Sequence, residues 1–74
     1  MREIASKIVI DPKIQGGRPV IKGARIPVDL VLGKIAGGMT IEELMREYGL
    51  KRKDVFAALQ YAARVIKEEI LIYT

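Results

Sequence analysis

The sequence contains neither cysteine nor histidine among its 74 residues. A disulfide framework and a thiolate metal site are therefore excluded, and the imidazole ligands that zinc and copper usually take are missing. The commonest general base is missing as well. Ser6, Thr40, Thr74 and three tyrosines remain as candidate nucleophiles, but none has a base close by in the sequence. We therefore expect no enzyme activity, no metal site and no cofactor.

Long apolar runs are also lacking, although half of the residues are apolar. No run approaches the roughly 20 residues that a membrane-spanning helix needs. Residues 1–5 do not resemble the hydrophobic segment of a signal peptide. We expect a cytoplasmic protein with no membrane partner, folded as a single domain over residues 1–74 whose small core would benefit from a second copy.

Asparagine is absent, whereas isoleucine, lysine, glutamate and arginine are plentiful. This bias is typical of proteins from hot habitats. It predicts a thermophilic source and a melting temperature above that of ordinary mesophilic domains.

The net charge of +4 is unevenly distributed along the chain. Residues 1–25 hold six cations and two anions, whereas residues 26–74 hold seven of each. A further cationic cluster stands at residues 51–53. The pattern favours a polyanionic partner such as double-stranded DNA, although ordinary solvated surface charge has the same appearance.

Residues 1–27 are expected to form a basic arm with a short β-hairpin. Residues 8–27 hold all three prolines and three of the seven glycines among β-branched residues, which predicts strands and tight turns. Residues 8–10 form a candidate strand, which ends where Pro12 cannot continue a strand ladder. Residues 20–21 and 25–27 flank Gly23, whose freedom to adopt positive φ suits a hairpin turn. Arg18, Lys22 and Arg25 are the cations of this hairpin that we predict to contact phosphate, although a solvated hairpin has the same sequence.

Residues 28–74 are predicted to hold three helices. The first begins after Pro27, has the apolar spacing of an amphipathic helix, and ends at Gly37-Gly38. The second spans about residues 41–48, because Thr40 and Glu43 have the spacing of a capping box. Gly49 ends it in a left-handed conformation. The third begins near residue 52 and continues to about residue 70, and residues 71–73 either extend it or form strand.

The apolar face of the third helix must be covered by the other helices or by a second chain. Its members are Val55, Ala58, Leu59, Ala62, Val65 and Ile66, with Phe56 and Ala63 widening the stripe.

The second and third helices, joined at Gly49, are predicted to form a helix-turn-helix. Apolar residues stand where that unit requires them to fix the crossing of its helices: Ile41, Leu44, Tyr48, Leu50, Val55 and Ala58. Met45 departs from the pattern, because a small residue usually occupies that position. The predicted fold is therefore mainly α, a three-helix helix-turn-helix domain preceded by a short β-hairpin.

The outer face of the third helix is predicted to enter the DNA major groove. Lys53, Ala57, Gln60 and Arg64 recur at helical spacing opposite the apolar stripe, and Gln and Arg can bind adenine and guanine in a bidentate manner. Lys51 and Arg52 stand at the helix start, where phosphates also meet free backbone amides. A helical hairpin with a merely solvated outer face would have a similar polar stripe.

The chain also resembles a family of bacterial and archaeal proteins known as domain of unknown function 433. The likeness covers nearly the whole chain and is carried by residues 10–12 and 17–28, the Gly37-Gly38 break, residues 42–44, Tyr48, residues 54–55, 58–59 and 61–62. Ala24 and Lys51 each replace a threonine that is usual in the family. Loss of the threonine at position 51 is expected to remove the cap of the third helix and to leave Asp54 with a helix-dipole role only.

The resemblance implies a homeodomain-like or winged three-helix fold. It also implies the antitoxin of a type II toxin-antitoxin pair, whose toxin is a PIN-like ribonuclease. Such an antitoxin would bind its own operator as a homodimer and regulate transcription. It would also cover the toxin's acidic site with a basic or apolar segment, for which the basic hairpin and the C-terminal Ile70, Leu71, Ile72 and Tyr73 are candidates. The same C-terminal residues could instead seal a homodimer. The alternative is a dimeric protein-interaction module that does not bind DNA.

Overall fold

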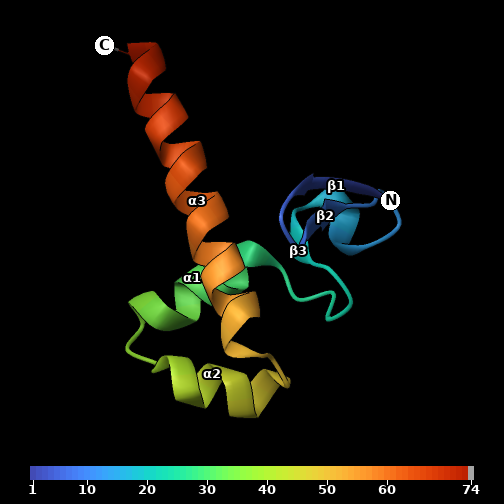
Figure 1. The fold of residues 1–74 in the computed structure, drawn as a ribbon, viewed down its shortest axis with the longest axis vertical. Coiled ribbons are helices and arrows are strands. Elements are labelled where there is room, and N and C mark those ends of the chain that lie inside the picture. The colour runs from blue at the N-terminus through green and yellow to red at the C-terminus, as the bar shows by residue number, and fades with distance from the viewer. Residues whose placement is uncertain (74) are drawn as a thin grey trace.

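The computed structural model describes residues 1–73, with side chains described for residues 1–69. It consists of three helices preceded by a small antiparallel sheet (Figure 1). The strands are β1 (Arg2–Ala5), β2 (Ile8–Ile10) and β3 (Val20–Ile21). The helices are α1 (Val28–Ala36), α2 (Ile41–Tyr48) and α3 (Arg52–Tyr73), and a short 3-10 helix spans Gln15–Gly17. The mainly helical fold with a small N-terminal β element is confirmed.

The sheet has three strands in the order β1-β2-β3. The predicted strand at residues 8–10 is β2, whereas β1 was not predicted. Val9 of β2 lies opposite Glu3 of β1 on one side and Val20 of β3 on the other. The segment after Gly23, which is at φ 84°, returns to β3 through one isolated bridge, between Val20 and Pro27. The predicted hairpin is therefore reduced to a single bridge, and the main partner of β3 is β2.

The helix boundaries follow local interactions that the sequence encodes. The Thr40 hydroxyl accepts from the Glu43 amide at 3.1 Å, and the Glu43 carboxylate accepts from the Thr40 amide at 2.9 Å. This reciprocal capping box fixes the start of α2. The same contacts lower the pKa of Glu43, the hydrogen bond from the Thr40 amide being the main cause. The helix then ends at Gly49, and both predicted boundaries of α2 are confirmed.

One apolar core joins the sheet to the helices. Its buried members come from β2, β3, all three helices and the α2–α3 turn: Ile8, Ile21, Val28, Val31, Leu44, Leu50, Val55, Ala57 and Ala58. Each fully buried aliphatic side chain of the size of Leu or Ile stabilises the fold by about 1.5–3 kcal/mol relative to exposure. The core therefore fixes the first part of α3 against α1, α2 and the sheet.

The C-terminal half of α3 extends beyond the rest of the molecule (Figure 1). The helix runs on to Tyr73, a little further than the predicted end near residue 70. Val65 and Ile66 are 39% and 56% exposed, so the chain itself covers only the first half of the apolar stripe on α3. Phe56 and Ala63, which the sequence placed in that stripe, are also exposed. None of the helices within the described residues has the length and hydropathy of a membrane span.

Candidate nucleic-acid interface

The junction between α2 and α3 is a tight turn centred on Gly49. This residue has φ 67° and ψ 28°, a left-handed conformation that glycine adopts without steric cost. The amide of Leu50 then donates to the carbonyl of Met45 at 3.1 Å, which closes the end of α2. Leu44, Leu50 and Val55 are buried on either side of the turn, and Met45 is half-buried against the same core. The two helices are therefore packed as a unit, and α3 does not continue through Gly49.

Asp54 caps the start of α3, contrary to the expectation that it has only a helix-dipole role. Its Oδ2 accepts from the backbone amide of Lys51 at 3.0 Å, and its Oδ1 lies 3.0 Å from the Nζ of Lys7. Burial by itself raises the pKa of Asp54, but these hydrogen bonds outweigh it and hold the pKa below its ordinary value. The carboxylate at the third position of α3 thus satisfies the amide of Lys51, the residue before the helix, as the Glu43 carboxylate does for Thr40 at α2. The amide of Asp54 donates to the carbonyl of Lys51 at 2.9 Å.

Lys7 is a residue of this site that the sequence did not reveal. It occupies the β1–β2 turn at φ 65°, 47 residues before its partner Asp54. Its carbonyl accepts from the amide of Lys22 at 2.7 Å. Through these contacts the tip of the sheet is held next to the first turn of α3. Only this pairing across the fold identifies Lys7, because nothing in its local sequence distinguishes it from other surface lysines.

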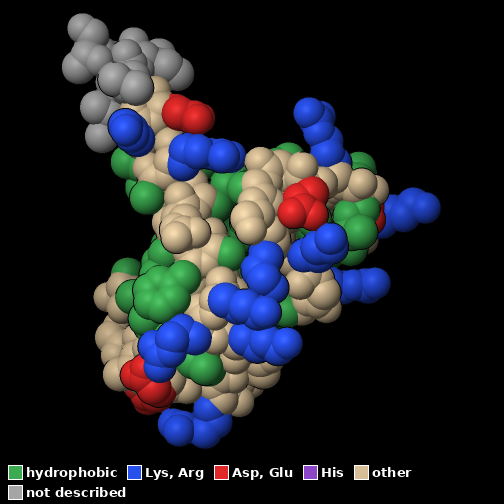
Figure 2. Space-filling view, in the orientation of Figure 1, with side chains coloured by type: hydrophobic (Ala, Val, Ile, Leu, Met, Phe, Trp, Pro, Cys, Tyr) green, Lys and Arg blue, Asp and Glu red, His purple; other side chains and the backbone are tan. Residues whose placement is uncertain are grey.

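The three cations predicted at the start of α3 are exposed, as an interface with phosphate requires. Lys51, Arg52 and Lys53 all face solvent. Arg52 forms an exposed ion pair with Glu42 of α2 at 3.1 Å, so part of its charge is neutralised within the molecule. In Figure 2 Lys and Arg side chains outnumber acidic ones on the face where the sheet meets the helices. This face has the charge that attracts a polyanion.

Lys53, Gln60 and Arg64 lie on the exposed side of α3. Arg64 donates to the carbonyl of Ile4 at 3.2 Å, and its guanidinium lies 5.8 Å from the ring centroid of Tyr61. Its Nε atom also lies 3.9 Å from the carboxylate of Glu68, one helical turn further on. These contacts orient the Arg64 side chain along the border between α3 and β1.

Ala57 does not belong to this exposed face, which corrects the predicted stripe. It is only 6% exposed, because the sheet packs over that part of α3. Ala5 and Ser6 lie across a hollow of about 190 Å³ from Ala57 and Gln60. The exposed arc of α3 is therefore narrower than its polar periodicity suggested, and the sheet forms one of its edges.

The three cations predicted on the hairpin, Arg18, Lys22 and Arg25, lie in different surroundings. Arg18 pairs with Asp29 of α1 at 3.1 Å, at the edge of an apolar groove. Lys22 pairs with Glu3 at 3.2 Å beside the Lys7 turn and lowers the pKa of that carboxyl through the hydrogen bond. Arg25 is exposed and has φ 59°. Of the three, Lys22 is the one connected to the start of α3.

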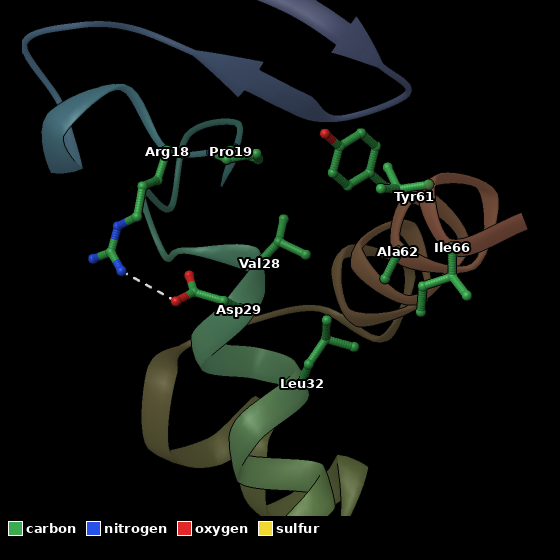
Figure 3. Close-up of a pocket in the computed structure, with 9 residues that line it drawn as sticks. Arg18, Pro19, Val28, Asp29, Leu32, Tyr61, Ala62 and Ile66 are labelled. Atoms are coloured by element: carbon green, nitrogen blue, oxygen red, sulfur yellow. Dashed lines mark hydrogen bonds and ion pairs between the residues drawn. The ribbon is translucent and has the colours of Figure 1, made fainter. Parts of the chain in front are cut away.

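The apolar groove lies between α1 and the second half of α3 (Figure 3). Val28 and Leu32 of α1 face Ala62 and Ile66 of α3 across it, and its volume is about 440 Å³. The predicted partner segment Ile70, Leu71, Ile72 and Tyr73 continues along the same helix. The side chains of those four residues lie outside the described part of the chain.

Comparison with known proteins places this arrangement in a family. A family model described as protein of unknown function (DUF433) matches residues 8–62, from β2 to the middle of α3. The chain belongs to the DUF433 family. The match includes β2, β3, the Gly49 turn and the start of α3, and it leaves out β1, Lys7 and Arg64. It confirms the resemblance seen in the sequence.

A solved structure of this family has the same fold. It is the crystal structure of a DUF433 member protein from Anabaena variabilis ATCC 29413, with 32% sequence identity and a TM-score of 0.76. The similarity covers 84% of this DUF433 chain and 62% of the other, so the chain spans less than two thirds of that structure's length. No curated protein matches the sequence.

Proposed function

We propose that this DUF433 protein is a DNA-binding antitoxin of a type II toxin-antitoxin pair. The observation that carries the DNA-binding part is the packed α2–Gly49–α3 unit, with Lys51, Arg52 and Lys53 exposed at the start of α3. Phosphates bind well at a helix start because cationic side chains and free amides act there together. Phosphate contacts would set the position of the protein on its own operator.

Gln60 and Arg64 are the residues proposed to read bases. Both are exposed, about two and three helical turns beyond Lys53 on the same side of α3. Their amide and guanidinium groups can form paired hydrogen bonds with adenine and guanine. Lys22 and Arg25 would contact the flanking backbone, Lys22 from its position beside the Lys7 turn. Arg18 would have to exchange its contact with Asp29 for DNA, as Lys22 would its contact with Glu3 and Arg64 its contact with Ile4.

The antitoxin part of the proposal rests on the resemblance to proteins treated as partners of PIN-like ribonucleases. The apolar groove beside Val65 and Ile66 supports a protein partner, since exposed apolar surface of this kind is typical of interaction sites. The C-terminal segment at residues 70–73 would extend that surface. The same groove favours the second candidate function, a protein-interaction module in which α2 and α3 do not contact DNA.

Salt-dependent binding to a duplex from the promoter of the protein's own gene separates the two candidates. Replacing Lys51, Arg52 and Lys53 with Ala should reduce the slope of log affinity against log salt by about 0.9 for each lost phosphate contact. A control triple variant, with Arg2, Lys13 and Lys34 replaced by Ala, removes the same charge from exposed positions outside α3. An equal slope in both variants would remove the start of α3 from the interface, and absence of duplex binding would favour the interaction module.

Sequence readout and toxin binding need separate measurements. Gln60→Ala or Arg64→Ala should relax the preference at single base pairs, at about 1–3 kcal/mol of discrimination for each bidentate contact. Co-purification with the product of an adjacent reading frame for a small PIN-like nuclease tests the antitoxin role. Failure of a neighbouring nuclease to co-purify would leave a DNA-binding regulator and reject the antitoxin.

A further inference from the structure

A second apolar pattern on α3 has the spacing of a coiled coil. Phe56, Leu59, Ala63 and Ile66 follow one another at steps of three, four and three residues. In the sequence the same steps continue to Ile70 and Tyr73. An alternation of three and four keeps apolar positions on one seam of two paired helices. The six positions span 18 residues, which is about two and a half heptads.

This seam, defined by Phe56, Leu59, Ala63 and Ile66, lies next to the face of α3 that the domain buries. Leu59 packs against the core and Ile66 lines the groove with α1, whereas Phe56 and Ala63 have no such role. Phe56 and Ile66 are 42% and 56% exposed, Ala63 is exposed and Leu59 is half-buried. Val55 and Ala58, one step away from the seam, are fully buried in the core. In Figure 2 hydrophobic side chains are visible on the molecular surface along the path of α3. The seam is therefore available for contact with another molecule.

We propose that α3 pairs with α3 of a second copy of this chain, in antiparallel orientation, through the seam. The spacing itself indicates a helix as the occupant, since a heptad pattern matches the pattern of an identical helix. In an antiparallel pair, the small side chain of Ala63 in one copy can lie opposite the larger side chain of Ile66 in the other. The two-fold symmetry repeats this contact, and the two contacts together fill the space between the helices. The exposed apolar groups that a chain of this size leaves uncovered are then buried.

Charge selects the antiparallel orientation. A parallel pair would bring together two copies of the cationic start of α3, with Lys51, Arg52 and Lys53 next to the same residues of the partner. Like charges at that distance repel one another. In the antiparallel pair the two cationic starts lie at opposite ends, and the positive end of each helix dipole approaches the negative end of the other.

Val65 provides a matched control for the proposal. It is 39% exposed on the same stretch of α3 but lines the groove against α1, outside the seam. In sedimentation equilibrium without DNA, the natural chain should be dimeric and Ala63→Glu should weaken association at least about tenfold, because it buries unpaired carboxylates. Val65→Glu should leave association nearly unchanged. The helical circular dichroism of each variant is measured to check that it remains folded.

Two results of that experiment would contradict the proposed pairing through the seam. A natural chain that stays monomeric at high protein concentration would exclude the pairing altogether. If Val65→Glu abolishes the dimer and Ala63→Glu keeps it, the dimer interface is the groove between α1 and α3 and not the seam.

The orientation is tested by single cysteines, which the natural chain lacks. In the antiparallel register the two copies of residue 56 lie about 25 Å apart along the helices, at 1.5 Å per residue. Phe56→Cys should therefore form no intermolecular disulfide, whereas Ala63→Cys near the two-fold axis should be joined by a short bismaleimide. An efficient intermolecular disulfide in the Phe56→Cys variant would show a parallel pair.

One consequence rests on the proposed DNA binding. With Ala63 opposite Ile66, the two copies of residue 52 are about 37 Å apart along the helix axes. Half-sites read by a helix-turn-helix dimer are about 34–36 Å apart, one turn of B-DNA. The two cationic starts would then lie about one turn apart on a duplex. The two copies of Gln60 and of Arg64 would lie only about 14 Å and 2 Å apart along the axes, so the bases that they read would form one central site between the two phosphate contacts. Association is measured without DNA, so a dimer that fails to bind duplex would reject the proposed DNA binding and keep the pairing of the α3 helices. A monomer that still binds duplex would reject the pairing and keep the DNA binding.

Discussion

The Nζ of Lys7 and the Oδ1 of Asp54 lie 3.0 Å apart although 47 residues separate them in the chain. Asp54 is almost fully buried, and its other oxygen accepts from the amide of Lys51. One carboxylate therefore caps α3 and fastens the sheet to it. This contact sets the position of the sheet beside the surface that we propose for DNA.

Asp54→Asn should lower the free energy of unfolding by about 1–2 kcal/mol at pH 7. Asn keeps an acceptor for the Lys51 amide but loses the ionic contact with Lys7, which leaves a partly buried ammonium without its counter-charge. Because folding lowers the pKa of Asp54, its contribution is present above the ordinary value of 3.8 and is lost as pH falls through the lowered value. In urea unfolding, the stabilities of the natural and variant proteins should therefore converge as the pH falls through the lowered pKa of Asp54.

The control for that experiment is Asp29→Asn, which breaks the exposed pair with Arg18. Exposed pairs contribute little, so the change should be under about 0.5 kcal/mol. Equal effects of the two variants, or a stability gap for Asp54→Asn that persists at acid pH, would contradict the role given to Asp54.

Gly49→Ala and Gly33→Ala should change stability in opposite directions. Neither position has another atom within 4 Å of the added Cβ, so backbone conformation decides the outcome. At φ 67° Gly49→Ala should cost about 1–2 kcal/mol. Gly33 lies inside α1, where alanine is favoured over glycine by up to about 1 kcal/mol. Chemical unfolding of both variants measures the difference, and a stabilising Gly49→Ala would mean that the turn is not left-handed.

Substitution by glutamine should lower stability at Ala57, which is buried, much more than at Ala63, which is exposed. Ala57→Gln forces a polar side chain under the sheet and should cost about 2 kcal/mol. Ala63→Gln introduces the same helix-forming residue at an exposed site and should be nearly neutral in the monomer. Thermal unfolding at low protein concentration compares them. Equal melting temperatures of the two variants would mean that Ala57 faces solvent, as the sequence predicted.

Thermal unfolding of the natural chain tests the prediction drawn from its composition. Ordinary mesophilic domains melt at about 45–65 °C, and this protein should melt well above that range. The measurement requires a low, fixed protein concentration, because association of the native chains raises the apparent melting temperature. A midpoint inside the mesophilic range would reject a hot source.

The features of this fold that the sequence predicted well depend on residues close together in the chain. Thr40 and Glu43 are three positions apart, and Gly49 acts through its own backbone, so α2 and the following turn were found at their observed boundaries. The cap formed by Asp54 is equally local but was missed, because its carboxylate, and not a residue 51 side chain, makes the bond.

Features that depend on distant parts of the chain were missed or misplaced. The strand β1 has few β-branched residues and is held in place by its pairing with β2. Ala57 was placed in solvent because the periodicity of one helix does not show a sheet packed over it. The ion pair of Lys7 has no signal in its own neighbourhood. Predicting these contacts requires the arrangement of the sheet on α3.

The unbroken course of α3 has a mechanical consequence. Its 22 residues include neither glycine nor proline, the residues at which helices most often bend. The buried first half and the protruding second half therefore turn as one rigid rod. A force applied at the end of α3 would therefore be carried to Val55 and Ala58 in the core, and the sheet and the other two helices would turn with it.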